Sequence, residues 1–271
     1  MGTQTARKWL SKKRALFGAL LGQRTGFFTQ YAFMDSVRRI ERYPAIEALC
    51  RAADIQPILD ALAGVDASDE FWFAESRHLG PLDAVLNFAL VSTVKPKRII
   101  EIGSGRSTHI LARAAPEATI TCIDPNPQQD IETLPVVFER RTLKPDDAEL
   151  AAQLEAGDIL YIDSSHILQP GTDVDIELNL MFPALKPGVV VHVHDVFLPW
   201  GYPVEWDARN WNEVSGLIPW IASGAFEIVL PSYFVAQTRA GDLRVAVPAF
   251  MAHCPNTASG GFWLRKRGLH G

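Results

Sequence analysis

The stretch Arg98-Ile-Ile-Glu-Ile-Gly-Ser-Gly-Arg-Ser-Thr108 decides the fold. Its β-branched first half predicts a short strand over residues 98–102. Apolar residues at Ile110 and Leu111 predict a short helix over residues 107–114. The glycines between them permit a tight turn, at which a ligand can approach the backbone and face the helix N-terminus. The stretch therefore predicts a strand, a ligand-binding turn and a helix in succession.

The same alternation of strand and helix continues on both sides of this stretch. Further strands are expected at residues 119–123, 136–138, 158–162, 189–194 and 226–230. Helices are expected at residues 43–64 (interrupted at Pro57), from residue 82 onward, and at 146–155, 174–185 and 211–221. Strands separated by helices indicate βαβ units with right-handed connections. The fold class is therefore α/β, with a Rossmann-like, doubly wound and mainly parallel sheet.

The composition sets the broad class of protein. The 271 residues are 48% hydrophobic and 21% charged, which is typical of a globular chain, and the net charge of −5 argues against a nucleic-acid partner. No segment reaches the ~20 apolar residues of a membrane span. The three cysteines lie far apart without a CxxC motif, which argues against a zinc site and favours a reducing compartment. We therefore expect a cytoplasmic protein.

The basic residues are concentrated at the start of the chain. Residues 1–34 hold six Lys or Arg and no acid. Three interpretations stay open: a membrane-surface helix within residues 1–30, a targeting segment, or a solvated helix that packs on the body or on a partner. We expect a helical extension with this basic arm over residues 1–65 and the α/β domain over residues 66–271.

Polar residues gather at the predicted carboxyl ends of the strands, where open α/β sheets bind ligands. Asp124 ends the second strand, 21 residues after Gly103, and can accept the hydroxyls of a ribose. Nicotinamide enzymes share that feature. However, Thr108 replaces the third glycine of their motif, and a carboxylate at Glu101 would repel a pyrophosphate but attract an ammonium or sulfonium. The alternatives are a strand-end acid at Glu101 and a turn cap at Asp124.

Glu101-Ile-Gly-Ser-Gly105 resembles the first motif of the class I S-adenosylmethionine-dependent methyltransferases, and Asp124 resembles their ribose-binding acid. The resemblance covers residues 80–267. It implies a seven-stranded sheet in the order 3-2-1-4-5-7-6, with an antiparallel last strand at residues 261–265. It also implies S-adenosylmethionine as cofactor. The cofactor-binding residues would then be Glu101, Gly103, Ser104, Gly105, Ser107, Thr108, Asp124 and Asp163.

Within that class, the chain resembles the branch with a D-x-x-H motif after strand four, here Asp163 to His166, and a His-Asp pair ending strand five. That branch includes metal-dependent O-methyltransferases that act on sugars. The resemblance implies O-methylation of a hydroxyl on a small molecule or glycan. His166 would be the general base, because imidazole titrates near neutrality, with Asp163 and Asp195 as further catalytic residues.

A metal ion at this site is a separate expectation. Asp163 and Asp195 end neighbouring strands in the resembled fold, and paired carboxylates bind a hard cation such as Mg²⁺ or share a proton. The branch usually supplies another acid where this chain has His194, so His194 is a candidate ligand for Mg²⁺ or a softer divalent metal. A metal-free mechanism based on His166 stays open.

Two other function classes stay open at this stage. One is a nicotinamide-linked oxidoreductase that uses the same glycine-rich turn, and the other is a non-catalytic cofactor-binding module. The aromatic stretch at residues 197–206 would either stack on a sugar and close the site or pack its loop onto the body. His192 is expected to be a hydrogen-bonded core histidine. The pattern carries no signal for oligomeric state.

Overall fold

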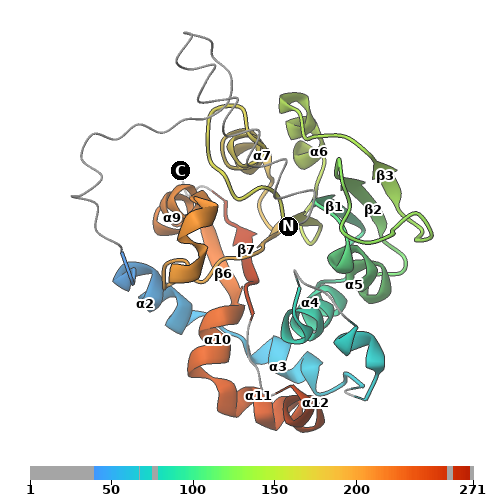
Figure 1. The fold of residues 1–271 in the computed structure, drawn as a ribbon, viewed down its shortest axis with the longest axis vertical. Coiled ribbons are helices and arrows are strands. Elements are labelled where there is room, and N and C mark those ends of the chain that lie inside the picture. Colours follow the sequence, from blue (N-terminus) through green and yellow to red (C-terminus); the bar gives the residue numbers. More distant parts are fainter. Residues whose placement is uncertain (1–39, 67, 75–78, 255–258, 269–271) are drawn as a thin grey trace. The chain divides into compact units, whose positions relative to one another are not determined.

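The computed structural model describes residues 40–66, 68–74, 79–254 and 259–268 (Figure 1). The basic arm, with the three interpretations attached to it, lies outside the described residues. One compact unit begins at Ile40. Helices α2 (Pro44–Ala52) and α3 (Gln56–Leu62) therefore belong to the same unit as the sheet, although the sequence assigned them to an extension over residues 1–65.

The described residues form a seven-stranded sheet in the order β3-β2-β1-β4-β5-β7-β6. The first five strands are parallel, and β7 runs antiparallel to both β5 and β6. The strands are β1 (Arg98–Ile102), β2 (Thr119–Ile123), β3 (Val137–Glu139), β4 (Ile159–Ile162), β5 (Val190–Val193), β6 (Phe226–Pro231) and β7 (Phe262–Lys266). This arrangement confirms the predicted fold class, strand order and antiparallel last strand.

Helices connect the strands. Their bounds are η2 (Glu70–Phe73), α4 (Pro81–Val94), α5 (Arg106–Ala114), η3 (Pro145–Asp147), α6 (Ala148–Ala152), α7 (Asp173–Ile176), η4 (Glu177–Met181), α8 (Phe182–Ala184), η5 (Val204–Arg209), α9 (Glu213–Ala222), α10 (Ser232–Thr238), α11 (Ala240–Ala246) and α12 (Pro248–His253). Several begin with a proline in the first turn, where its missing N–H costs no helical hydrogen bond. None of the helices in the described segments has the length and apolar character that crossing a membrane requires.

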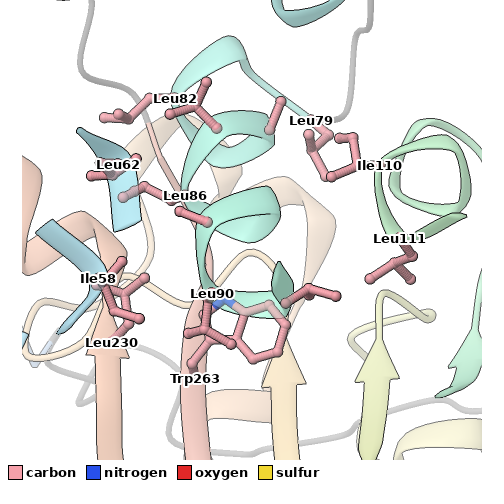
Figure 2. Packing of buried hydrophobic residues seen from close by; sticks show 14 of the residues in the cluster. Ile58, Leu62, Leu79, Leu82, Leu86, Leu90, Ile110, Leu111, Leu230 and Trp263 are labelled. Atoms are coloured by element: carbon pink, nitrogen blue, oxygen red, sulfur yellow. The ribbon is translucent and has the colours of Figure 1, made fainter. Parts of the chain in front are cut away.

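Alternation along the strands divides the core between the two faces of the sheet. On β4, Ile159 and Tyr161 join one hydrophobic cluster, while Leu160 and Ile162 join the other. The first cluster lies between the sheet and helix α4, nine of whose fourteen residues are buried. Figure 2 shows side chains of α3 and α4 close to those of β6 and β7 in this cluster, with Ile110 and Leu111 of α5 on the other side of α4. Two covered faces explain why the strands are apolar almost throughout.

The strand register brings the loops after β1, β2, β4 and β5 to one edge of the sheet. The Gly103 N–H donates to the Ile123 carbonyl at 3.0 Å, and the Asp163 N–H donates to the Ile102 carbonyl at 2.9 Å. The His194 N–H continues the ladder to the Ile162 carbonyl at 2.9 Å. The polar residues that the sequence placed at strand ends therefore follow one another along a single edge.

Candidate functional site

The glycine-rich turn after β1 packs directly against the loop after β4. Gly103 has a φ of +80°, which L-residues rarely adopt. A Cβ atom at this position would lie 2.0 Å from the Asp163 carbonyl oxygen. Only glycine therefore lets the two loops approach this closely.

Glu101 supports this turn from inside the protein. Its side chain is 0% exposed, and its carboxylate accepts hydrogen bonds from the hydroxyls of Ser107 at 2.6 Å and Thr108 at 2.7 Å. The Thr108 hydroxyl also accepts the Gly105 N–H at 3.0 Å. The sequence led us to expect direct attraction between Glu101 and a bound cation. The structure instead turns this carboxylate inward, where it joins the strand to the start of α5.

Burial raises the pKa of Glu101 to about 7, although hydrogen bonds from Ser107, Thr108 and Cys122 oppose the rise. The folded state therefore retains this proton at pH values where the unfolded chain has lost it. The resulting stabilisation is fully present below about pH 4.5, the ordinary pKa of a glutamate, and is lost as the pH rises to about 7.

We expect Glu101→Gln to remove this dependence. Relative to the wild type, the variant should gain roughly 3 kcal/mol of unfolding free energy between pH 4.5 and 7.5, from a shift of about 2.5 pKa units. Urea unfolding at a series of pH values measures this difference. Glu117→Gln, at an exposed position, is the control. Parallel pH profiles for Glu101→Gln and the wild type would contradict the prediction.

Asp124 caps the loop after β2. One carboxylate oxygen accepts the Ser104 N–H at 2.7 Å and the Ser104 hydroxyl at 3.0 Å, and the other accepts the Asn126 N–H at 2.6 Å. The Gln128 N–H donates to the Ser104 carbonyl at 3.1 Å, so the loops after β1 and β2 are tied together. The turn-cap interpretation of Asp124 is therefore observed, while its ribose contact stays a prediction.

Three predicted residues meet after β4 and β5. Asp163, His166 and Asp195 each present a ligand atom, and these atoms lie within 4.8 Å of one another. His166 Nε2 is 3.6 Å from an Asp163 oxygen and 3.7 Å from an Asp195 oxygen. His194 Nε2 lies 3.8 Å from the other Asp195 oxygen, and His194 is not part of this three-residue group. The strand ends thus converge as predicted, with His166 in the place that we considered for His194.

The charges within the three-residue group are strongly coupled. Burial raises the pKa of Asp163, but the charge of His194 and the hydrogen bond and charge of His166 outweigh it and lower the pKa to about 2. Burial raises the pKa of Asp195. Burial lowers the pKa of His166, yet hydrogen bonds and charge from Asp163 and Glu213 raise it well above 6.5. Asp163 and Glu213 therefore favour the protonated form of His166 in this arrangement.

Sequence reasoning missed Glu213. Its carboxylate oxygen lies 2.9 Å from His166 Nδ1, and both side chains are buried. Trp211 packs against the His166 ring, with 4.2 Å between the ring centroids. A signal was present in the sequence, because Glu213 shares the buried face of α9 with Leu217 and Ile221, at intervals of four residues. A carboxylate on a buried helix face needs a polar partner.

His192 differs from the hydrogen-bonded histidine that we expected. Neither ring nitrogen has a hydrogen-bond partner among the described residues. The ring stacks on Tyr161, with centroids 4.0 Å apart, and lies 4.5 Å from the Trp263 ring. Burial lowers the pKa of His192 well below 6.5, so the imidazole is neutral and behaves as an aromatic core residue.

The segment before β7 holds the backbone next to Asp195 in place. Buried Asp83 on α4 accepts the Gly260 N–H at 3.0 Å, the Gly261 N–H at 3.2 Å and the Ser259 hydroxyl. The Gly260 carbonyl in turn accepts the N–H of Val196, the residue after Asp195, at 2.8 Å. This support was also absent from the sequence analysis, because Asp83 and Ser259 are 176 residues apart.

The aromatic residues after β5 pack on one another. Phe197 meets Trp206 edge to face at 5.1 Å, and Trp206 meets Trp211 at 4.9 Å. The Arg209 guanidinium lies over both tryptophan rings, at 4.0 Å from Trp206 and 4.5 Å from Trp211. The interpretation that this stretch packs its own loop is therefore observed, and the packing ends at His166.

A family model matches part of the chain. Residues 100–196, from β1 to the residue after Asp195, match a family model described as a methyltransferase domain. No curated protein matches the sequence significantly.

Solved structures with a similar arrangement include a Thermobifida fusca YX protein assigned as a methyltransferase, with 16% identity, a TM-score of 0.42 and coverage of 82% of this chain and 98% of that one. Another is MycE of the mycinamycin pathway, crystallised with Mg, S-adenosylhomocysteine and mycinamycin VI (14%, TM-score 0.41, coverage 79% and 56%). A third is a Bacillus cereus O-methyltransferase with S-adenosylhomocysteine (14%, TM-score 0.38, coverage 86% and 94%).

The identification depends on the family model and the strand order rather than on these distant structures. The matched segment holds the glycine-rich turn, Asp124 and the three-residue group. Residues 100–196 thus match a methyltransferase domain, and they lie in a sheet whose strand order is the one implied by the resemblance to the class I S-adenosylmethionine-dependent methyltransferases.

Proposed function

We propose that this domain transfers a methyl group from S-adenosylmethionine to a hydroxyl oxygen of a small molecule or glycan. The cofactor would lie against the glycine-rich turn, and the acceptor would lie at Asp163, His166 and Asp195. The observation that carries the proposal is the packing of Gly103 on the backbone of Asp163, which brings the glycine-rich turn next to the loop of Asp163 and His166.

The residues around the turn suit the cofactor. Ser104 and Gly105 are small, and the first turn of α5 follows them directly. Asp124 already accepts three donors, but a carboxylate has about four lone-pair sites, so it retains capacity for a ribose hydroxyl. Glu101, through Ser107 and Thr108, would hold the turn in shape. When bound, the cofactor supplies an electrophilic methyl group on a good leaving group.

The acceptor hydroxyl is the chemical difficulty, because an alcohol is scarcely ionised near neutrality. In the transfer, the new oxygen–carbon bond forms as the carbon–sulfur bond breaks and its electron pair stays on sulfur. The hydroxyl proton must go to a nearby base, and we assign it to His166 Nε2. The Glu213 carboxylate, which accepts the Nδ1–H hydrogen bond, would stabilise the imidazolium that results.

His166 can act as base only if Nε2 is unprotonated when the acceptor binds. The two flanking carboxylates oppose that state, because they hold the pKa of His166 high. Asp163 and Asp195 supply the oxygen donors that Mg²⁺ prefers, so a divalent cation fits the group. When bound, such a cation would offset the carboxylate charge and stabilise a developing alkoxide. The metal-free alternative leaves His166 with the carboxylates alone.

Cofactor binding tests the proposal without knowledge of the acceptor. Calorimetry should show binding of S-adenosylhomocysteine and none of NAD(H) or NADP(H). Asp124→Asn should weaken the affinity by about tenfold or more, because hydrogen bonds to a charged group contribute about 1.5–3 kcal/mol. Asp60→Ala, on exposed α3 surface, is the matched control. Binding of a nicotinamide nucleotide instead would favour the oxidoreductase, and unchanged affinity in Asp124→Asn would exclude the ribose contact.

A further inference from the structure

Three consecutive residues hold His166 from different directions. The Trp211 ring packs against the imidazole, with centroids 4.2 Å apart. The His166 carbonyl accepts the N–H of Asn212 at 3.1 Å and that of Glu213 at 3.3 Å. The Glu213 carboxylate meets Nδ1 at 2.9 Å. We call residues 211–213 the clamp, because they contact the backbone, the ring face and the ring edge of one histidine.

The clamp is itself anchored to the loop that carries His166. The Asn212 side-chain oxygen accepts the Leu168 N–H at 2.7 Å, and its amide group donates to the Leu168 carbonyl at 3.1 Å. This two-way pairing ties the clamp to the chain two residues beyond His166. The ring therefore cannot shift relative to Glu213 without the loss of several hydrogen bonds at once.

The backbone of His166 needs this support. Its φ of +60° lies in the left-handed region, which is unfavourable for an L-residue and persists where the surroundings determine it. That backbone conformation, together with the clamp, directs Nδ1 into the protein and Nε2 towards Asp163 and Asp195, at 3.6 and 3.7 Å. The orientation of the ring is thus determined from both ends.

A carboxylate at this place is costly, which argues for a chemical role. Glu213 is 1% exposed, and its pKa is raised by burial and by the like charges of Asp173 and Asp163. A buried carboxylate destabilises the fold unless a partner stabilises its negative charge. A carboxylate that accepts the Nδ1–H hydrogen bond fixes the tautomer of a histidine and makes Nε2 more basic. Both effects help a histidine that accepts a proton, or binds a cation, through Nε2.

We propose that Glu213 is the positioning residue of His166. Its carboxylate accepts the hydrogen bond from Nδ1–H and so directs Nε2 to the side where Asp163, Asp195 and the acceptor meet. The proposal rests on the proposed function for the role given to Nε2, whereas the hydrogen bond itself can be tested independently.

Nuclear magnetic resonance on protein labelled with ¹⁵N-histidine tests it. In the wild type, His166 should show a downfield Nδ1–H signal that exchanges slowly with water. His166→Gln assigns that signal by its absence. Glu213→Ala should abolish the signal, and Glu213→Gln should retain a weaker hydrogen bond and move it upfield, because an amide oxygen carries no charge. Glu205→Gln, an exposed acid of the same region, should leave the signal unchanged.

Kinetics extend the test once an acceptor is in hand. Glu213→Ala should lower kcat by about 10–100-fold, the usual cost of losing a carboxylate behind a functional histidine, with Glu213→Gln less affected. The KM for the cofactor should not change.

The results separate this proposal from the proposed function. Absence of the protected signal in the wild type, or its survival in Glu213→Ala, would overturn the positioning role even if S-adenosylhomocysteine binds. Failure of S-adenosylhomocysteine to bind the wild type would overturn the proposed function, and the signal would still report on Glu213. If Glu213→Ala does not fold, the upfield shift in Glu213→Gln decides, and an unshifted signal there counts against the proposal.

Discussion

Replacement of His166 by alanine should lower the rate of methyl transfer by about 10²–10⁴-fold, the range that a positioned base contributes. Nε2 of His166 lies with Asp163 and Asp195 at the acceptor end of the proposed site. Without the imidazole, the alcohol loses the base to which we assign its proton. Cofactor affinity should be retained, because the glycine-rich turn and Asp124 do not depend on His166.

The measurement requires an acceptor, which a screen can supply. Transfer of label from S-adenosylmethionine to a panel of sugars, glycolipids and phenols identifies one, and its turnover by wild type and variant gives the ratio. His253→Ala is the control, since His253 lies exposed on α12 and bonds to the Ala249 carbonyl of its own helix. A rate that does not change in His166→Ala would remove His166 from proton transfer.

The same assay distinguishes the metal-assisted from the metal-free mechanism. If Asp163 and Asp195 hold a cation, a chelator should abolish turnover by the wild type, and Mg²⁺ should restore it. His166→Ala should then retain a metal-dependent residual rate, because the alkoxide would still be stabilised. Turnover that is indifferent to the chelator would leave His166 and the carboxylates as the whole machinery.

The sequence predicted the sheet well because each strand ends at a chemical boundary. β1 ends just before Gly103 and β2 ends just before Asp124. Each of these strands can therefore be recognised from local sequence alone, as an apolar run followed by a glycine or a polar residue. Helices α10, α11 and α12 were not predicted. Each has only six or seven residues, fewer than two turns, so a 3.6-residue period cannot emerge from its apolar positions.

Some residues of the candidate site could likewise be predicted from local sequence, and others could not. Asp163, His166 and Asp195 were predicted because parallel strands bring their carboxyl ends together whatever the side chains are. The inward direction of Glu101 follows from period-two alternation, since Glu101 shares its face of β1 with Ile99, and helices cover that face. Glu213 meets His166 only through tertiary packing, because the two residues are 47 positions apart in the sequence. No local sequence pattern predicts such a contact.

The second large effect concerns Gly103. Gly103→Ala should destabilise the protein by roughly 2–5 kcal/mol, because the strain of a left-handed alanine adds to the steric overlap of its Cβ with the backbone. That Cβ would lie 2.0 Å from the Asp163 carbonyl oxygen and 2.9 Å from its carbonyl carbon. The carbonyl cannot withdraw freely, because the N–H of Asp163 is bonded to the Ile102 carbonyl at 2.9 Å. Any relief must separate β1 from β4 at the proposed site, so S-adenosylhomocysteine binding should be lost as well.

Gly224→Ala is a close control for this prediction, since Gly224 has a φ of +78° and, apart from its chain neighbours, no atom of the described residues lies within 4 Å of the added Cβ. This substitution introduces backbone strain alone. It should lower the free energy of unfolding by about 1–2 kcal/mol and leave cofactor binding unchanged. Urea unfolding of both variants, with calorimetry on the folded fraction, measures the difference. Equal destabilisation by the two substitutions would mean that the loops after β1 and β4 can move apart at no cost. In that case the close contact at Gly103 would not determine how the glycine-rich turn packs against Asp163.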